Sequence, residues 1–305
     1  MTEEVPLDCI YVAASSHDAR FTRICIASVR YFYPEMPIRL LVGGRLQRGL
    51  LGELERYWRV NAAALEDGEY GWGFVKLEPL FGTAGERFLV LDSDTVLTGE
   101  VISKWSESAA PFCVDDEQQS EEDTRRLYYD WQSLSEIDPL AQAPAFLFNS
   151  GQWFGTSGIL TREDFVPWID WVMPRRLHHP NLFMPGDQGV LNYVLNRKSQ
   201  LEGLHVDRRK IMCWPGHSLE GLDAASIEER ICPAFVVHWA GMKSMWLKNM
   251  VGADLLAFFE RYYYDNTPGG RLRQINNNIS TLTALLFEAA FTKVRLAARK
   301  IASGR

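Results

Sequence analysis

Two carboxylates end an apolar run in the segment FLVLDSD, residues 88–94. Asp92 and Asp94 stand one residue apart, and two negative groups held that close repel each other unless one is protonated or a cation lies between them. Mg²⁺ and Mn²⁺ are hard cations that take carboxylate oxygens together with substrate phosphates as ligands. The pair therefore favours a metal–diphosphate site, and capping of a following helix is the structural alternative.

The carboxylate pair also invites comparison with two well-known acidic loops. An EF-hand calcium loop is excluded because Val96 stands where that loop needs an oxygen ligand. The pattern of Asp92, Asp94 and Val96 also resembles the nucleophile loop of haloacid-dehalogenase-type phosphatases, which implies Asp92 as nucleophile and Asp94 as acid or base. Those enzymes usually carry the loop on their first strand, whereas a strand–helix–strand–helix unit precedes it here, so the phosphatase is the second enzymatic hypothesis.

Two further segments offer polar groups beside a strand or helix end. FNSGQWFG, residues 148–155, presents Asn149, Ser150 and Gly151 in succession, which suits recognition of ligand hydroxyls with close backbone approach. PGDQGVLNYV, residues 185–194, sets Asp187 and Gln188 at the start of an amphipathic helix. There Asp187 is either an N-terminal cap or a carboxylate that faces substrate.

The segment VVHWAGMKSMW, residues 236–246, places a histidine at the end of an apolar strand. The imidazole of His238 is a candidate third ligand to Mn²⁺ in a mixed nitrogen and oxygen site. Gly241 and Lys243 follow it, and a lysine at this distance can neutralise a phosphate.

The elements that must position these residues alternate in type. Strands are predicted over 9–15, 38–44 and 86–94, and helices over 22–32 and 50–60. This order is typical of a parallel, doubly wound α/β sheet. Ligands bind at the carboxyl ends of the strands in such sheets, which is where the aspartate pair falls.

The second half of the chain has a less regular pattern. Strand-like apolar runs are expected at 144–151 and 233–241, and helical patterns at 164–173 and 186–197. Residues 115–138 are polar, charged and aromatic, and form either a solvated connector or a lid that faces an acceptor.

Taken in order over about residues 8–250, these motifs resemble the GT-A fold glycosyltransferases, most closely the retaining family 8 that uses nucleotide-diphosphate sugars. The resemblance implies a Rossmann-like mixed or parallel sheet flanked by helices. It also implies that Asp92, Asp94 and His238 bind Mn²⁺, or Mg²⁺ in its place, and that Asp187 and Gln188 flank the anomeric carbon of the donor. The donor-binding residues that it implies are Ala13, Ser15, Asp18, Lys76, Ser93, Asn149, Ser150, Gly151, Gly241 and Lys243.

The sequence departs from the family pattern at two places. Ser15 and Ser16 stand where the first strand usually ends in acidic residues, so the nucleoside base is left open and Asp18 is the candidate substitute. Lys243 comes one residue early and the proline after it is missing, although Trp246 keeps its spacing.

The function expected from the resemblance is transfer of a hexose from UDP-Gal, UDP-Glc or UDP-GlcNAc to a glycan or glycolipid, with retention of configuration. The UDP-sugar is then a co-substrate. A non-catalytic module that binds sugar nucleotides or glycans is the third hypothesis, since it needs the same groups without turnover.

Composition limits the remaining classes. The 305 residues are 47% hydrophobic and 23% charged, as in a globular protein, and the net charge of −7 argues against a nucleic-acid partner. Five cysteines without a CxxC pair indicate reduced thiols. The acidic start MTEEVPLDCIYVAA has no signal-peptide pattern. We therefore expect a cytoplasmic protein.

We expect a catalytic domain over 1–265, with donor binding in about 1–100 and acceptor binding and catalysis in about 140–250. Residues 266–270 are the expected linker to a basic amphipathic helical tail over 271–305. The tail has seven basic residues and one acid, with an apolar stripe at helical spacing. It either packs on protein, including a second copy, or contacts anionic lipid at the inner face of the plasma membrane.

Overall fold

The structure is a computed structural model. It describes residues 6–15, 18–66, 68–71, 73–106, 108–216, 221–244, 246–279 and 283. The chain forms two compact units, Met1–Phe259 and Glu260–Arg305. The candidate site residues all belong to the first unit.

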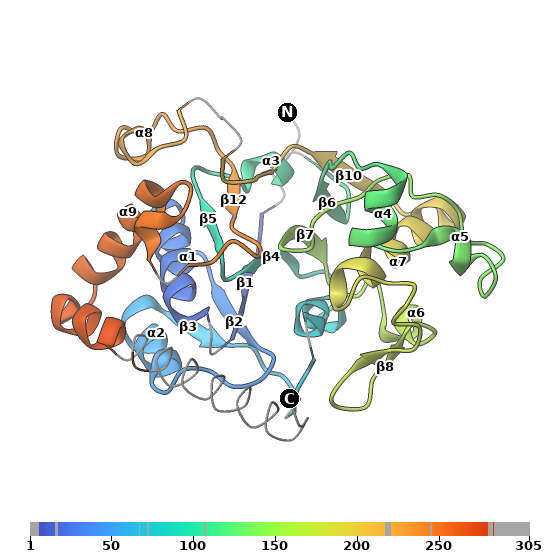
Figure 1. The fold of residues 1–305 in the computed structure, drawn as a ribbon, viewed down its shortest axis with the longest axis horizontal. Helices are drawn as coiled ribbons and strands as arrows, with labels where there is room; N and C mark the ends of the chain where they lie inside the picture. The colour runs from blue at the N-terminus through green and yellow to red at the C-terminus, as the bar shows by residue number, and fades with distance from the viewer. Residues whose placement is uncertain are drawn as a thin grey trace, which may run out of the picture. The chain divides into compact units, whose positions relative to one another are not determined.

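The first unit is built on a mixed sheet, seen edge-on at the centre of Figure 1. In spatial order its seven described strands are β10 (Val206–Arg209), β6 (Phe112–Asp115), β7 (Gln152–Thr156), β4 (Arg87–Asp92), β1 (Cys9–Ala14), β2 (Ile38–Val42) and β3 (Val60–Ala62). All pairs are parallel except those of β7, which runs antiparallel to both β4 and β6. The carboxyl ends of β1, β2, β4 and β6 therefore share one edge with the start of β7.

A second, three-stranded sheet has the order β11 (Met212–Cys213), β12 (Val236–His238) and β5 (Thr95–Leu97). The turn Ser93–Asp94 joins β4 of the main sheet to β5 of this small sheet. β5 pairs antiparallel with β12, with His238 opposite Thr95. The DSD segment is thus the crossing point between the two sheets.

Helices cover the main sheet on both sides (Figure 1). On one side α1 (Ala19–Phe32) contacts β1 and β5, and α2 (Leu50–Trp58) contacts β3. On the other side the 3₁₀ helix η2 (Phe74–Phe81) packs on β1 and β2 and against α7 (Asp187–Glu202). Because both faces are covered, the strands are almost continuously apolar, as in FLVL of β4, where every residue is fully buried.

The strand expected over 144–151 is wrong, and the reason lies in α7. Residues 144–151 contain a bend and a turn and form only one isolated bridge, from Leu147 to Glu117. Two buried asparagines on α7 bind the backbone of this segment instead of a neighbouring strand. Asn192 accepts from Phe148 N at 3.0 Å and donates to its carbonyl at 2.9 Å. Asn196 likewise accepts from the N–H groups of Ala145 and Phe146 and donates to the carbonyl of Phe146.

The helix expected over 164–173 is also largely wrong. Only α6 (Arg162–Phe165) forms, followed by the small hairpin of β8 (Ile169–Asp170) and β9 (Arg176–Leu177). Pro167 explains the early end, because it has no N–H to donate to the carbonyl of Glu163 and its ring crowds that carbonyl.

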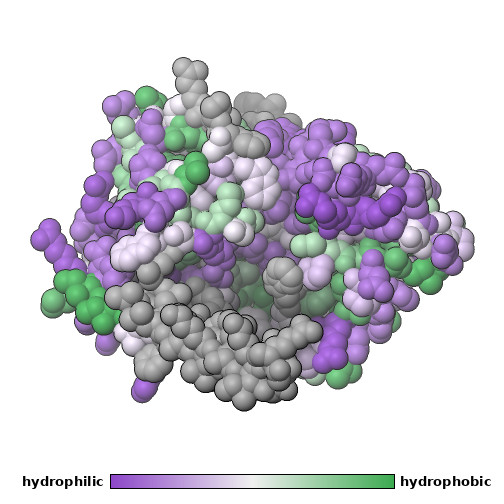
Figure 2. Space-filling view, viewed as in Figure 1, coloured by the Kyte–Doolittle hydropathy of each residue, from purple (hydrophilic) through white to green (hydrophobic). Residues whose placement is uncertain are grey.

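The polar segment 115–138 contains two short helices, α4 (Glu121–Leu127) and α5 (Trp131–Leu134). Ser120 caps α4 by accepting from Asp123 N at 3.0 Å, and acidic residues fill its first turn as the helix dipole favours. Figure 2 shows strongly hydrophilic residues over α4. The solvated surface expected of this segment is present, and its role as a lid stays a prediction.

The remaining elements are short apart from the last helix. They are α3 (Ser103–Ser106), α8 (Ala224–Glu228), η3 (Leu247–Asn249) and α9 (Ala253–Asp265). Turn residues 266–269 follow α9, and 270–279 are helical. The later residues of the apolar stripe of the tail (Leu282, Leu286 and Ala289) and its basic residues from Lys293 onward lie outside the described part of the chain. Among the described helices, none combines the length and apolarity needed to cross a bilayer.

The hydrogen bonds from Asn192 and Asn196 to the backbone of residues 145–148, here called the asparagine ladder, should stabilise the fold. Asn192→Ala leaves the buried N–H and C=O of Phe148 unpaired, so we expect the free energy of unfolding to fall by about 2 kcal/mol or more. Asn181→Ala, at an exposed position, should change it by less than about 0.5 kcal/mol. Urea unfolding of both variants measures the difference, and equal stabilities would show that the ladder contributes nothing.

Candidate active site

Three side chains far apart in sequence meet where the two sheets join. Asp92 is the last residue of β4, Asp94 lies in the turn that follows, and His238 is the last residue of β12. The pairing of β5 with β12 continues into this turn, since Trp239 N donates to the carbonyl of Asp94 at 3.0 Å. Strand register therefore brings the histidine to the aspartates.

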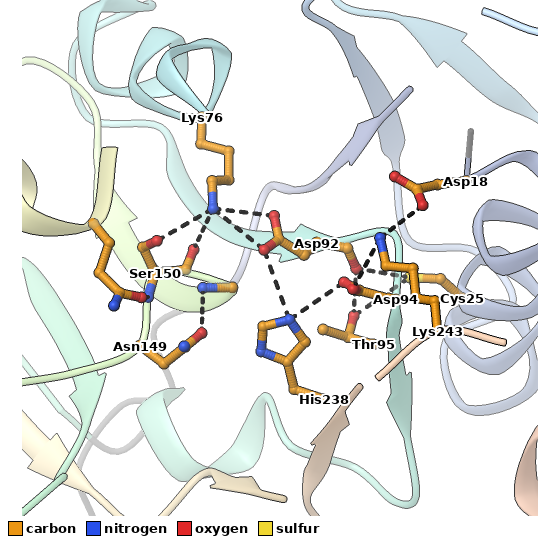
Figure 3. Close-up of polar contacts among 12 residues, drawn as sticks. Asp18, Cys25, Lys76, Asp92, Asp94, Thr95, Asn149, Ser150, His238 and Lys243 are labelled. Atoms are coloured by element: carbon orange, nitrogen blue, oxygen red, sulfur yellow. Dashed lines mark hydrogen bonds and ion pairs between the residues drawn. The ribbon is translucent and has the colours of Figure 1, made fainter. Parts of the chain in front are cut away.

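The distances within this triad are short. The Nε2 atom of His238 lies 3.2 Å from Asp94 Oδ1 and 3.7 Å from Asp92 Oδ2 (Figure 3). One ligand atom from each residue can be chosen so that all lie within 4.8 Å of one another. His238 is 2% exposed and Asp94 is 6% exposed, whereas the side chain of Asp92 is 27% exposed, so the triad is open to solvent on the Asp92 side only.

Lys243 neutralises one side of the triad. Its Nζ lies 3.0 Å from Asp94 Oδ2 and 2.6 Å from Asp18 Oδ1. Ser15 Oγ donates to the other oxygen of Asp18 at 2.8 Å. Burial acts to raise the pKa of Asp94, but His238 and Lys243 outweigh it and hold that pKa well below its ordinary value. Asp94 is therefore ionised and available as a ligand.

Lys76 neutralises the opposite side. Its Nζ lies 3.1 Å from Asp92 Oδ1 and 3.1 Å from Asp187 Oδ2, and it donates to Ser150 O and Oγ at 3.1 and 3.2 Å. Burial raises the pKa of Asp187, and the attraction of Lys76 opposes that shift. Burial also acts to lower the pKa of Lys76, but Asp187 and Asp92 raise it above its ordinary value. This buried ammonium therefore stays charged.

A cavity of about 530 Å³ opens over these groups. It is lined by most of the site residues predicted from the sequence, namely Ala13, Ser15, Asp18, Lys76, Asp92, Ser93, Asp94, Asp187, His238, Gly241 and Lys243. Its position at the carboxyl ends of β1, β2 and β4 is the place where ligands bind in open α/β sheets.

The four other predicted residues lie beside the cavity instead of lining it. Gly151 N donates to Asn149 Oδ1 at 2.8 Å, which closes a tight turn. Gln188 accepts from Ser150 N at 3.3 Å and donates to the carbonyl of Leu127 at 2.7 Å. Both ends of its amide are thus engaged with backbone, so Gln188 holds two loops together in this structure.

The triad fits a divalent cation by its donor set. Two carboxylates and one imidazole form the mixed oxygen and nitrogen set that suits Mn²⁺. Within the part of the chain that the structure describes, Nδ1 of His238 is buried without a hydrogen-bond partner, and the buried Nε2 has only its contacts with Asp94 and Asp92. A buried imidazole whose Nε2 faces two carboxylates fits the role of a third metal ligand.

No family model and no curated protein matches the sequence. Solved structures do match. The galactosyltransferase LgtC in complex with donor and acceptor sugar analogues has a TM-score of 0.55 at 14% identity, over 83% of this chain and 95% of that one. An active-site mutant of LgtC has a TM-score of 0.56 at 12% identity, over 82% and 94%. The bifunctional glycosyltransferase WbbM has 0.54 at 13%, over 89% of this chain and 51% of that one.

The chain has the GT-A glycosyltransferase fold. The fold class and the resemblance predicted from the four motifs are confirmed. At these identities the likeness establishes the fold alone, so the activity of this GT-A chain must be argued from its site.

Sequence reasoning missed several residues of the site. Arg45 lines the cavity beside the pair Gly43–Gly44, which the sequence pattern marked only as the end of a strand. Gly73 also lines it, and a Cβ there would lie 2.1 Å from Asp187 Oδ1. Trp214 stacks on His238 with ring centroids 5.6 Å apart. The glycine pair before Arg45 was a signal that could have pointed to it, whereas nothing in the sequence marked Gly73 or Trp214.

A side chain at position 73 should clash with Asp187 in addition to straining the backbone. The φ of Gly73 is +79°, and Gly85 has a similar φ of +89° but open space around it. Both Gly→Ala variants should lose about 1–2 kcal/mol from the left-handed backbone. Gly73→Ala should lose more, because its methyl group displaces Asp187. Urea unfolding compares the two, and an equal loss would show that the carboxylate has room to move.

Removal of Lys76 should be costly and pH-dependent. Lys76→Met leaves the buried Asp187 and the partly buried Asp92 without this counter-charge, so we expect a loss of about 3–5 kcal/mol at neutral pH. Lys198→Met, which breaks only surface pairs, should lose about 1 kcal/mol or less.

The sign of the pH effect follows from the raised pKa of Asp187. The folded protein keeps a proton on this group at pH values where the unfolded chain has lost it, so acidification through that window favours the folded state. Without Lys76 the pKa rises further, and the deficit of Lys76→Met should shrink as the pH falls. Urea unfolding in EDTA at several pH values checks this, and a deficit that grows in acid would contradict it.

Proposed function

We propose that this protein is a metal-dependent glycosyltransferase that transfers a hexose from a nucleotide-diphosphate sugar to a glycan or glycolipid with retention of configuration. UDP-Gal, UDP-Glc and UDP-GlcNAc are the candidate donors. The single observation that carries the proposal is the convergence of Asp92, Asp94 and His238 at the floor of a cavity bordered by two lysines. The GT-A fold supports it.

The charges of the cavity match the demands of the reaction. Cleavage between the anomeric carbon and the diphosphate builds negative charge on the leaving group. Mn²⁺ or Mg²⁺, held by Asp92, Asp94 and His238, supplies Lewis-acid stabilisation of that charge when bound. Lys243 lies 3.0 Å from Asp94, close enough to place a second positive charge against the same diphosphate.

Asp187 is the group we assign to the sugar. Its carboxylate lines the cavity on the far side of Asp92 from Lys243, and Lys76 bridges it to Asp92. A carboxylate in this place stabilises positive charge that develops at the anomeric carbon, as in glycoside hydrolysis. Gln188 supports this site by fixing the Ser150 turn through its amide.

The nucleoside end of the cavity is assigned to Ser15 and Asp18. The first strand ends without an acidic residue, but Asp18 brings a carboxylate to the cavity from just before α1. Ser15 and Lys243 hold that carboxylate in place. Asp18 thereby supplies the negative group that the strand lacks. Ala13, Ser93 and Gly241 line the same cavity and offer close backbone approach to the donor.

The two other hypotheses predict different behaviour. A phosphatase would use Asp92 as nucleophile, but this residue ends the fourth strand of the main sheet in chain order, and the fold is that of glycosyltransferases. A binding module would hold the donor without turnover. Membrane contact or dimerisation through 271–305, and a cytoplasmic location, stay predictions.

A donor screen tests the proposal. Thermal unfolding is followed with UDP-sugars in the presence of Mn²⁺ or EDTA, together with slow hydrolysis of each donor. We expect at least one UDP-sugar to raise the melting temperature only with Mn²⁺, since a ligand stabilises the state that binds it. Asp94→Asn should abolish the shift, and Asp207→Asn, remote on β10, should keep it.

The screen also separates the hypotheses. Donor hydrolysis that is lost in His238→Ala supports the transferase. Phosphomonoester hydrolysis that survives His238→Ala would favour the phosphatase, and stabilisation without turnover would favour the binding module. A wild-type protein that no sugar nucleotide stabilises would contradict the proposal.

A further inference from the structure

The imidazole of His238 lies under an indole ring that no motif marked. The rings of Trp214 and His238 are 5.6 Å apart between centroids and inclined by only 16°, so they are stacked. β11 and β12 are parallel, with Met212 beside Val236 and Cys213 beside Val237. One further step along this register sets Trp214 beside His238, on the same face of the small sheet.

Gly151 packs against the imidazole of His238 from another side. A Cβ built on this glycine would lie 2.1 Å from Cε1 and 2.6 Å from Nδ1 of His238. The ring is therefore packed against backbone in a place where any side chain would displace it. Trp214 and Gly151 together form a slot for the imidazole.

The slot replaces a hydrogen bond that metal-binding histidines normally have. Such a histidine usually donates from its second ring nitrogen to a carboxylate or carbonyl, which fixes the orientation of the ring. Here Nδ1 is buried and has no partner among the described residues, while Nε2 faces the two carboxylates. On the Nδ1 side, packing by Trp214 and Gly151 takes the place of that hydrogen bond.

We propose that Trp214 is a positioning residue that holds His238 in its metal-binding orientation by stacking. The inference rests on the proposed metal site of the transferase. Trp214 stacks on the imidazole and so acts on the ion through that ring. Trp214 itself is half-buried.

Mn²⁺ itself is the probe. Electron paramagnetic resonance gives the affinity from the signal of free Mn²⁺, and pulsed measurements detect the nitrogen of a directly bound imidazole. The variants are Trp214→Leu, which keeps apolar bulk without a ring, and Trp214→Phe, which keeps a ring. Trp171→Leu is the matched control, since Trp171 is half-buried and packs edge-on against Phe81 outside the cavity.

We expect Trp214→Leu to bind Mn²⁺ about 10- to 100-fold more weakly and to lose the imidazole nitrogen signal. Trp214→Phe should restore both, and Trp171→Leu should match the wild type. If Trp214→Leu does not fold, Gly151→Ala tests the same slot from its other side and should show the same two losses.

The outcomes separate this inference from the proposed function. A wild-type protein that binds no Mn²⁺ would overturn both. Wild-type binding with an imidazole signal that persists at full affinity in Trp214→Leu, or in Gly151→Ala where that variant is used, would overturn the positioning role alone. A loss in Trp214→Leu that Trp214→Phe does not restore would also overturn it, because bulk and not stacking would then be responsible.

Discussion

Mutual repulsion among four carboxylates is the constraint on which the site depends. Asp18, Asp92, Asp94 and Asp187 line one cavity, and Lys76 and Lys243 contact all of them in pairs. The two lysines leave two of the four negative charges unbalanced, and Arg45 at the cavity wall balances one of these, so the cavity keeps a negative charge that attracts a cation. Groups of like charge at this separation keep their ionised form only when such partners are present.

The fold supplies these partners from elements that have separate structural reasons to be there. Lys76 comes from η2, which packs on β1 and β2, and Lys243 follows β12 in the small sheet. Because the chain crosses from β4 to β5, Asp92 ends a strand of the main sheet and Asp94 directly precedes a strand of the small sheet. A change in either sheet therefore alters the distance between the two carboxylates, so the stability of the fold and the geometry of the site are coupled.

The sequence allowed prediction wherever one local pattern decides the structure. Apolar runs before Asp92 and His238 predicted buried strands, and helical spacing after Asp187 predicted α7, because burial on both faces and helix periodicity are local signals. The strand predicted over residues 144–151 is absent because Asn192 and Asn196, 44 to 51 residues further along the chain, bind its backbone. The stacking of Trp214 depends on the register of β11 with β12. That register is set by the pairing of two strands far apart in the chain, so no short stretch of sequence predicts it.

The most direct measurement is the anomalous X-ray scattering of Mn²⁺ in crystals of the protein soaked with Mn²⁺ and UDP. The account predicts one strong anomalous peak bounded by the carboxylates of Asp92 and Asp94 and by Nε2 of His238, with the diphosphate of UDP on its open side. A peak elsewhere, or UDP bound in the cavity with no ion between these three side chains, would contradict it.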